Sequence, residues 1–341
     1  MNSDPIRSGR VAAWVFTLLT TLIAFWALGP RPSFVERWEE PELPEDLDRW
    51  ASDREAGVPG LRAGDGREIV WVDPATRSRT DVSLVYLHGF SADRHEVEPV
   101  ISDLGRELGA NVFFTRLAGH GRDGPAMAEA TVEAWLADAA EAIAVASRIG
   151  DRIVLTGTST GATLALWTAA RPEVRDRVAA MILVSPNLQP KDRSSRVFLQ
   201  PWGEQIARVV AGPERCWEPL NEEQGRHWTT CYPMAAVTPM MALVERVRTM
   251  DLSSIVAPTL VLYSPDDDVV DVDEIRARLA TMTSAPIQTS DIPSTTDPSS
   301  HVLAGSIVSP ESVDEARSLM ADFLREQLGG GVSFPDGGAD D

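Results

Sequence analysis

Gly157-Thr158-Ser159-Thr160-Gly161 lies between two runs of residues with different structural preferences. The run before it, Arg152-Ile153-Val154-Leu155-Thr156, is typical of a buried strand, and the run after it, 162–170, is typical of a helix. A Gly-x-Ser-x-Gly pattern at a strand-to-helix turn predicts a nucleophile elbow, because only small residues fit beside so tight a turn. The pattern therefore predicts that Ser159 exposes its hydroxyl at the tip of a sheet, where the helix N-terminus favours developing negative charge.

On both sides of this turn, apolar runs of strand length alternate with helical stretches. This alternation predicts an α/β fold, with a mostly parallel sheet covered by helices on both faces. The expected strands are 68–72, 82–87, 111–114, 152–156, 178–184, 259–263 and 287–290, and the expected helices are 94–109, 131–149, 162–170, 272–282 and 310–327.

The alternation stops after Pro186 and resumes after Met250. The intervening residues are rich in Trp, Met and Pro, and they predict an insertion that folds over the sheet as a lid. The chain then divides into a core at 67–186, a lid at 187–250 and a second core part at 251–328. A spacer rich in Pro, Glu and Asp occupies 31–66, and residues 329–341 are expected to form a disordered acidic tail.

The N-terminal residues 1–30 contain an uncharged and almost wholly apolar stretch at 11–28. Spanning a bilayer takes about 20 such residues, so we expect an uncleaved membrane anchor, with a cleaved signal peptide as the alternative. Arg7 and Arg10 precede the stretch, and positive charges stay on the cytoplasmic side. The sequence thus predicts a catalytic domain on the extracytoplasmic (periplasmic) side, with secretion as the alternative.

The composition excludes some classes of function. The 341 residues are 43% hydrophobic and 24% charged, as in an ordinary globular protein, and the net charge of -20 argues against a nucleic-acid partner. Two cysteines, Cys216 and Cys231, suit a disulfide in an exported domain, with two buried thiols as the alternative. Because no histidines accompany them at ligand spacing, we expect no zinc site there.

A serine hydroxyl needs a base, and the base needs an acid that holds it in one tautomer. On a sheet of this kind the chain order is serine, acid, histidine, and among the five histidines only His301 lies late enough. The acid should follow the strand that ends at Tyr263, where three aspartates, 266–268, are adjacent and the residue pattern does not choose among them. For the oxyanion, we expect the backbone N–H groups of Phe90 and Thr160 to be the donors.

Together these segments resemble the α/β-hydrolases, over residues 67–328. The resemblance is carried by His88-Gly89-Phe90, Arg116-Leu117-Ala118-Gly119-His120-Gly121, the elbow, the aspartate cluster and His301. The most similar branch contains monoacylglycerol lipases, carboxylesterases and serine aminopeptidases. Its Gly-x-x-Asp-x-Val pattern matches Ser264-Pro265-Asp266-Asp267-Asp268-Val269, with Ser264 in place of Gly, and this singles out Asp267. In such proteins the Gly-His-Gly loop shapes the pocket, so the resemblance implies a structural role for His120.

The resemblance implies a serine esterase that works by two-step acyl transfer, without a metal or organic cofactor. We expect a small acyl ester as substrate, with the apolar lid favouring an apolar one. The oligomeric state is left open. An acyltransferase, an aminopeptidase with lid glutamates at 204, 214, 218, 222 and 223, and a catalytically silent membrane-anchored binding protein are the alternatives. A dehalogenase or epoxide hydrolase is disfavoured, because those relatives carry Asp at the elbow.

Overall fold

The computed structural model describes residues 5–292 and 295–329, with side chains from residue 13 onward. A seven-stranded sheet at its centre has the order β1-β3-β2-β4-β5-β8-β9. All neighbouring strands are parallel except β1 and β3. This confirms the predicted α/β fold with a mostly parallel sheet. The strands are β1 (Glu68–Val70), β2 (Thr80–Leu87), β3 (Asn111–Phe114), β4 (Gly150–Thr158), β5 (Val178–Val184), β8 (Thr259–Tyr263) and β9 (Ile287–Asp291).

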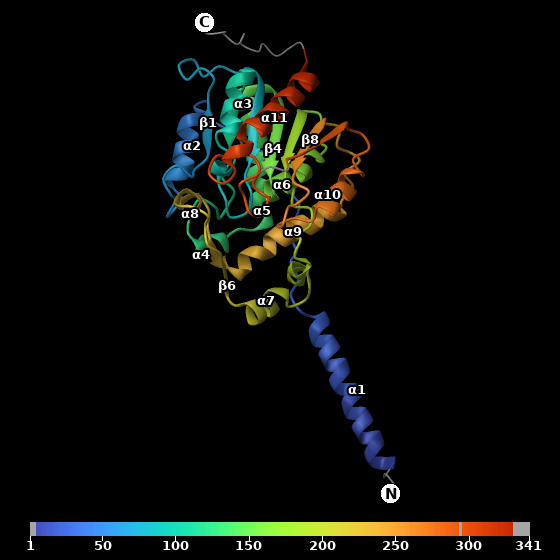
Figure 1. The fold of residues 1–341 in the computed structure, drawn as a ribbon. Coiled ribbons are helices and arrows are strands. Elements are labelled where there is room, and N and C mark those ends of the chain that lie inside the picture. The colour runs from blue at the N-terminus through green and yellow to red at the C-terminus, as the bar shows by residue number, and fades with distance from the viewer. Residues whose placement is uncertain (1–4, 293–294, 330–341) are drawn as a thin grey trace.

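Both faces of the sheet are buried, because successive side chains of a strand point to opposite faces. In β2, Leu84 and Tyr86 belong to one apolar cluster, whereas Val85 and Leu87 belong to the other. Helices α3 (Val100–Leu108) and α11 (Val313–Leu328) cover the first face (Figure 1). Helices α5 (Val132–Ile149), α6 (Thr160–Ala169), α9 (Val237–Thr249) and α10 (Val272–Leu279) pack into the cluster on the other face.

One predicted helix is divided in the structure. Instead of a continuous helix at 94–109, the chain forms the short 3₁₀ helix η1 (Arg94–Glu96) and then α3. Pro99 lies between them, and a proline interrupts a helix because it has no N–H to donate. As a result η1 becomes a separate turn that carries its own polar side chains.

The segment between β5 and β8 forms a layer of short elements: η2 (Arg193–Leu199), α7 (Gly203–Ala211), β6 (Glu214–Cys216), α8 (Glu222–His227), β7 (Cys231–Pro233), η3 (Met234–Ala236) and α9. Strands β6 and β7 are antiparallel and place Cys216 opposite Cys231, and the two residues form a disulfide. This confirms the favoured pairing. Met234 and Met241 are buried with Phe198 and Tyr232, so these methionines form the interior of the layer.

Residues 31–66 lie against the domain and include α2 (Leu47–Ala56), which the sequence pattern does not predict. Glu36 accepts a hydrogen bond of 2.8 Å from the indole N–H of Trp167 on α6, and it also pairs with Arg246. Trp38 packs against the ring of Trp167. This segment therefore covers the end of α6 opposite the serine turn. A second helix missed by the sequence pattern is α4 (Gly124–Met127).

Helix α1 (Pro5–Ala27) extends away from the domain beside α7 (Figure 1). Its contact with the domain is made by Phe25, whose ring stacks on Trp202 at a centroid distance of 4.7 Å. Among the described residues, no helix has both the length and the apolar character needed to cross a bilayer. The structure thus does not support the transmembrane anchor predicted within residues 1–30. Of the expected disordered tail, residues 330–341 lie outside the described residues.

Candidate active site

The turn between β4 and α6 has the geometry of a nucleophile elbow. Ser159 has φ 53° and ψ -116°, a left-handed backbone that a non-glycine residue rarely adopts. The turn is tightly packed, because a Cβ on Gly161 would lie 1.9 Å from the carbonyl oxygen of Leu87, and one on Gly157 would lie 2.6 Å from the backbone of Gly161. The backbone N–H of Ser159 donates to the oxygen of Val184 at 2.9 Å, which fixes the turn to the end of β5.

Asp267 and His301 form a buried hydrogen-bonded pair, with 2.8 Å between Asp267 Oδ2 and His301 Nδ1. The other carboxylate oxygen of Asp267 accepts from the N–H groups of Val269 and Val270 at 2.8 and 2.9 Å. The neighbouring Asp266 and Asp268 are exposed. The structure therefore distinguishes among the three aspartates by burial and contact. Lys191, the only lysine in the chain, binds the backbone oxygen of Asp267 and the carboxylate of Asp268.

His301 is held at its backbone as well as its ring. Asp297 accepts hydrogen bonds from the N–H groups of His301 and Val302 at 3.0 and 2.8 Å. Ser185, which follows β5, donates to the carbonyl oxygen of His301 at 2.8 Å. Since the Ser159 turn is bonded to Val184, these contacts bring the serine and the histidine to the same end of β5.

The pKa of His301 is raised above its ordinary value. Burial alone would lower it, but the negative charges of Asp267 and Asp297, with the hydrogen bond that the ring donates to Asp267, outweigh the burial. Such a balance suits a base that must hold a proton during the reaction.

The two predicted oxyanion donors follow the carboxyl ends of the neighbouring strands β2 and β4. Thr160 is the first residue of α6, and the first N–H groups of a helix have no acceptor within it. Phe90 follows β2, and its ring contacts Tyr232 edge-on at a centroid distance of 5.3 Å. Within the described part of the chain, none of the hydrogen bonds uses the N–H of Phe90.

Two buried histidines support this loop. His88 Nε2 accepts from the N–H of Leu117 at 3.0 Å, while its Nδ1 lies 2.9 Å from the oxygen of Gly89. Burial lowers the pKa of His88 to about 4, so the ring is neutral and acts as a brace. His120 contacts the rings of His88 and Phe90, and burial lowers its pKa as well.

Glu96 is the site residue that sequence reasoning missed most clearly. It lies on η1, is buried, and accepts hydrogen bonds from the N–H of Gly89 and from the hydroxyl of Tyr86. The same tyrosine contacts Thr158 Oγ1 at 2.8 Å, so a polar chain connects the elbow with the loop of Phe90. Burial raises the pKa of Glu96 to about 8.

Comparison with known proteins agrees with this geometry. A family model described as the alpha/beta hydrolase family matches residues 84–328. No curated protein matches the chain significantly.

Solved structures of low sequence identity share the fold. A structure from work on LipS and LipT, two metagenome-derived lipolytic enzymes, is 18% identical with a TM-score of 0.61, over 78% of this chain and 99% of the other. A soluble variant of monoglyceride lipase from Saccharomyces cerevisiae, bound to a substrate analog, is 12% identical with a TM-score of 0.58, over 87% and 99%. Monoacylglycerol lipase from Paleococcus ferrophilus is 17% identical with a TM-score of 0.53, over 76% and 98%.

Proposed function

The chain belongs to the alpha/beta hydrolase family, and from this premise we propose that it is a serine hydrolase that cleaves carboxylic esters. The observation that carries the proposal is the buried Asp267–His301 pair, held at the end of β5 to which the Ser159 turn is bonded. An acid, a base and a strained serine turn are the parts that an acyl-transfer reaction requires.

In the proposed mechanism, Ser159 Oγ attacks the ester carbonyl while His301 Nε2 accepts the hydroxyl proton. Asp267 keeps the proton of Nδ1 on the ring and stabilises the imidazolium that forms. The N–H groups of Phe90 and Thr160 donate to the oxyanion, and His301 then protonates the leaving alcohol. A water molecule activated by His301 releases the acid and restores Ser159.

The substrate class is proposed as a small ester with an apolar acyl group. The similar structures include a monoacylglycerol lipase and a monoglyceride lipase, whose names describe enzymes that act on acyl esters. In this chain the aromatic rings of Phe90 and Tyr232 lie beside the proposed oxyanion loop. The lid glutamates 214, 218, 222 and 223 are exposed, and the half-buried Glu204 pairs with Arg208, which gives no support to a buried pocket for a substrate amine.

The proposal is tested by turnover of p-nitrophenyl esters of increasing chain length by the full chain in detergent. Ser159→Ala should abolish turnover and His301→Ala should nearly do so, whereas Ser194→Ala, at an exposed serine, should retain it. Adding an alcohol acceptor to the same assay measures acyl transfer. Turnover unchanged by Ser159→Ala would refute the mechanism, and folded parent protein without any turnover would favour the silent binding protein.

We also propose that the catalytic domain lies on the extracytoplasmic side, anchored by the N-terminal segment or secreted. The support is the disulfide between Cys216 and Cys231, since such bonds persist in oxidising compartments, together with the apolar stretch at 11–28 after two arginines. Fusing alkaline phosphatase to the C-terminus would test the side of the membrane, and cell fractionation would distinguish attachment from secretion. An inactive fusion in the cytoplasm would refute the location.

A further inference from the structure

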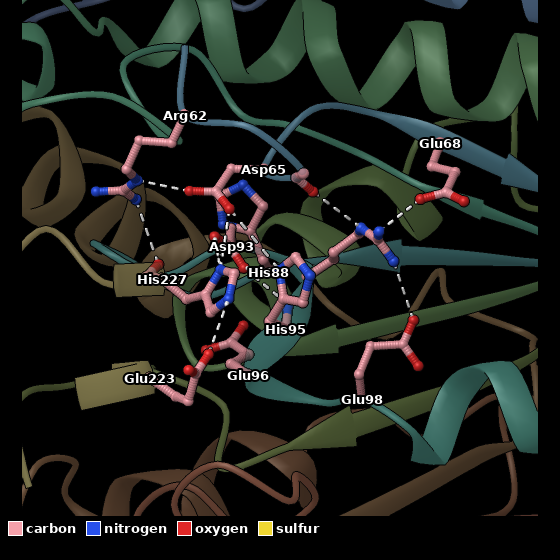
Figure 2. A network of polar contacts seen from close by, with 12 residues as sticks. Arg62, Asp65, Glu68, His88, Asp93, His95, Glu96, Glu98, Glu223 and His227 are labelled. Carbon is pink, nitrogen blue, oxygen red and sulfur yellow. Dashed lines mark hydrogen bonds and ion pairs between the residues drawn. The ribbon is translucent and has the colours of Figure 1, made fainter. Parts of the chain in front are cut away.

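A cluster of two aspartates and two histidines lies apart from the Asp267–His301 pair, at the junction of three segments distant in sequence (Figure 2). Asp65 precedes β1, Asp93 and His95 lie at η1, and His227 ends α8 in the lid. Both aspartates are nearly inaccessible to solvent, at 2% and 1% exposure, and His227 is 9% exposed. Side chains of this kind at such depth need strong partners, because burying a charge is costly.

The four side chains direct their ligand atoms toward one another. One ligand atom from each side chain, a ring nitrogen or a carboxylate oxygen, lies within 4.8 Å of those of the other three. His227 Nδ1 is 2.9 Å from Asp65 Oδ1 and 3.3 Å from Asp93 Oδ2, while His95 Nδ1 is 2.8 Å from Asp93 Oδ1 and 3.9 Å from Asp65 Oδ1. With zinc bonds of about 2.0–2.2 Å, the ligand atoms of a tetrahedral site lie about 3.3–3.6 Å apart. Some of the observed separations are shorter than this range and one is longer.

The surroundings also suit a bound cation. Ligating histidines almost always offer their second ring nitrogen to a carboxylate or carbonyl, and His227 Nε2 lies 3.7 Å from Glu223 Oε2 on the same helix. Arg62 pairs with the outer oxygen of Asp65, which orients that carboxylate. The imidazole rings of His95 and His227 are stacked at 3.8 Å, so both present their Nδ1 atoms to the same pair of carboxylates.

We propose that Asp65, Asp93, His95 and His227 form a structural site for a divalent transition metal of the zinc class, which fastens the lid to the core. Two imidazole nitrogens with two carboxylate oxygens match the ligand preference of Zn²⁺ and differ from the all-oxygen sets that Ca²⁺ and Mg²⁺ prefer. Four protein ligands complete a tetrahedral site, so the metal is structural. It takes no part in the ester cleavage proposed above.

The metal would strengthen a junction that is otherwise held by hydrogen bonds and apolar packing. Near the cluster, Thr229 donates to the oxygen of Ser91 at 2.7 Å and to that of Arg122 at 3.2 Å, and Arg62 donates to the oxygen of His227 at 3.4 Å. A metal that binds His227 and Asp93 would add a strong connection at this point. Since Asp93 caps η1 and His95 lies within it, the same metal would also hold the turn that carries Glu96 against Gly89.

Metal content tests the proposal directly. The full chain, purified in detergent, is stripped with EDTA, incubated with Zn²⁺, freed of excess metal by gel filtration and measured by elemental mass spectrometry. The expected result is one equivalent of Zn²⁺ retained by the parent, with a rise in thermal midpoint on Zn²⁺ addition. His227→Gln and Asp65→Asn should lose both effects. Glu68→Gln, which changes a neighbouring carboxylate that pairs with Arg94 outside the ligand set, should keep both.

Should the ligand variants fail to fold, Co²⁺ substitution in the parent provides a second readout. Intense visible absorption of four-coordinate Co²⁺, displaced by one equivalent of Zn²⁺, would support the site. Parent protein that retains no Zn²⁺ above the level left after EDTA treatment, or that shows only weak six-coordinate Co²⁺ absorption, would overturn it and leave the cluster as a set of ion pairs. Neither readout depends on ester turnover, so the two proposals fail independently.

Discussion

Replacing Glu96 with glutamine should remove a strong pH dependence of folding stability. The carboxyl group of Glu96 is buried at η1 and receives hydrogen bonds from Gly89 N–H and Tyr86 hydroxyl on the same oxygen, Oε1. A glutamine carbonyl oxygen can accept both bonds. Unlike the glutamate, the glutamine has no proton to lose, so the variant keeps the contacts and removes the charge.

The size of the effect follows from the pKa of Glu96, which burial raises from 4.5 to about 8 in the folded protein. Because this pKa is higher in the folded than in the unfolded state, the stabilisation is complete below the unfolded value and is lost as pH rises through the folded one. A shift of about 3.5 units at about 1.36 kcal/mol per unit has a ceiling of about 5 kcal/mol. Between about pH 5 and about pH 9 the expected loss is about 4 kcal/mol.

Urea unfolding of parent and Glu96→Gln at these two pH values measures the difference. Other ionisable groups titrate similarly in both proteins and cancel, so the parent should lose about 4 kcal/mol relative to the variant on going to high pH. Glu311→Gln, at an exposed position, serves as the control and should follow the parent. Equal pH dependence in parent and Glu96→Gln would refute the buried, protonated state assigned to Glu96.

Three further outcomes are expected. Asp267→Asn should lower kcat for ester turnover by about 10⁴-fold because it leaves His301 in the wrong tautomer, whereas Asp266→Asn and Asp268→Asn should stay within a few-fold; equal losses at all three positions would show that the acid is wrongly assigned. The pH profile of kcat/KM should reach half its plateau above pH 6.5, because the pKa of His301 is raised from that value and the base must be neutral; a midpoint below it would contradict the assigned environment. Replacing both Cys216 and Cys231 with serine should lower the free energy of unfolding by about 3 kcal/mol, since the bond closes a loop of 15 residues; unchanged urea unfolding would argue against the bond in the native protein.

The strands could be predicted closely because burial on both faces leaves a continuous apolar run. Strands β5 and β8 have the predicted bounds, Val178–Val184 and Thr259–Tyr263. Helix α2 could not be predicted in this way. It is polar over most of its length, and its position depends on Glu55, which pairs with Arg67 and Arg116 from distant parts of the chain.

In the site, too, some residues could be predicted from their sequence neighbours, whereas others depend on contacts with distant parts of the chain. The serine turn has a local signal, because Gly157 and Gly161 are required by its packing. The choice of Asp267 over its neighbours depends on which side chain the loop buries beside His301, and physical reasoning from the residues did not decide it. The resemblance to a family pattern selected the residue that the structure pairs with His301.

Two supporting carboxylates were missed for different reasons. Asp297 has a local signal, since an Asp-Pro-Ser turn whose carboxylate accepts nearby N–H groups is a common loop device. Glu96 has no such local signal, because an acidic residue in a polar stretch of sequence is usually exposed to solvent. Its burial results from contacts with β2 and with Gly305, where a Cβ would lie 2.0 Å from the Glu96 carbonyl oxygen.

The most direct test of the central claim, that Ser159 is an activated nucleophile, is covalent labelling with a fluorophosphonate followed by peptide mass spectrometry. The full chain in detergent should gain a single adduct on the peptide that contains Ser159, and the adduct should be absent from Ser159→Ala and slow to form in His301→Ala. A folded parent that forms no adduct, or one that carries it on another serine, would contradict the mechanism proposed here.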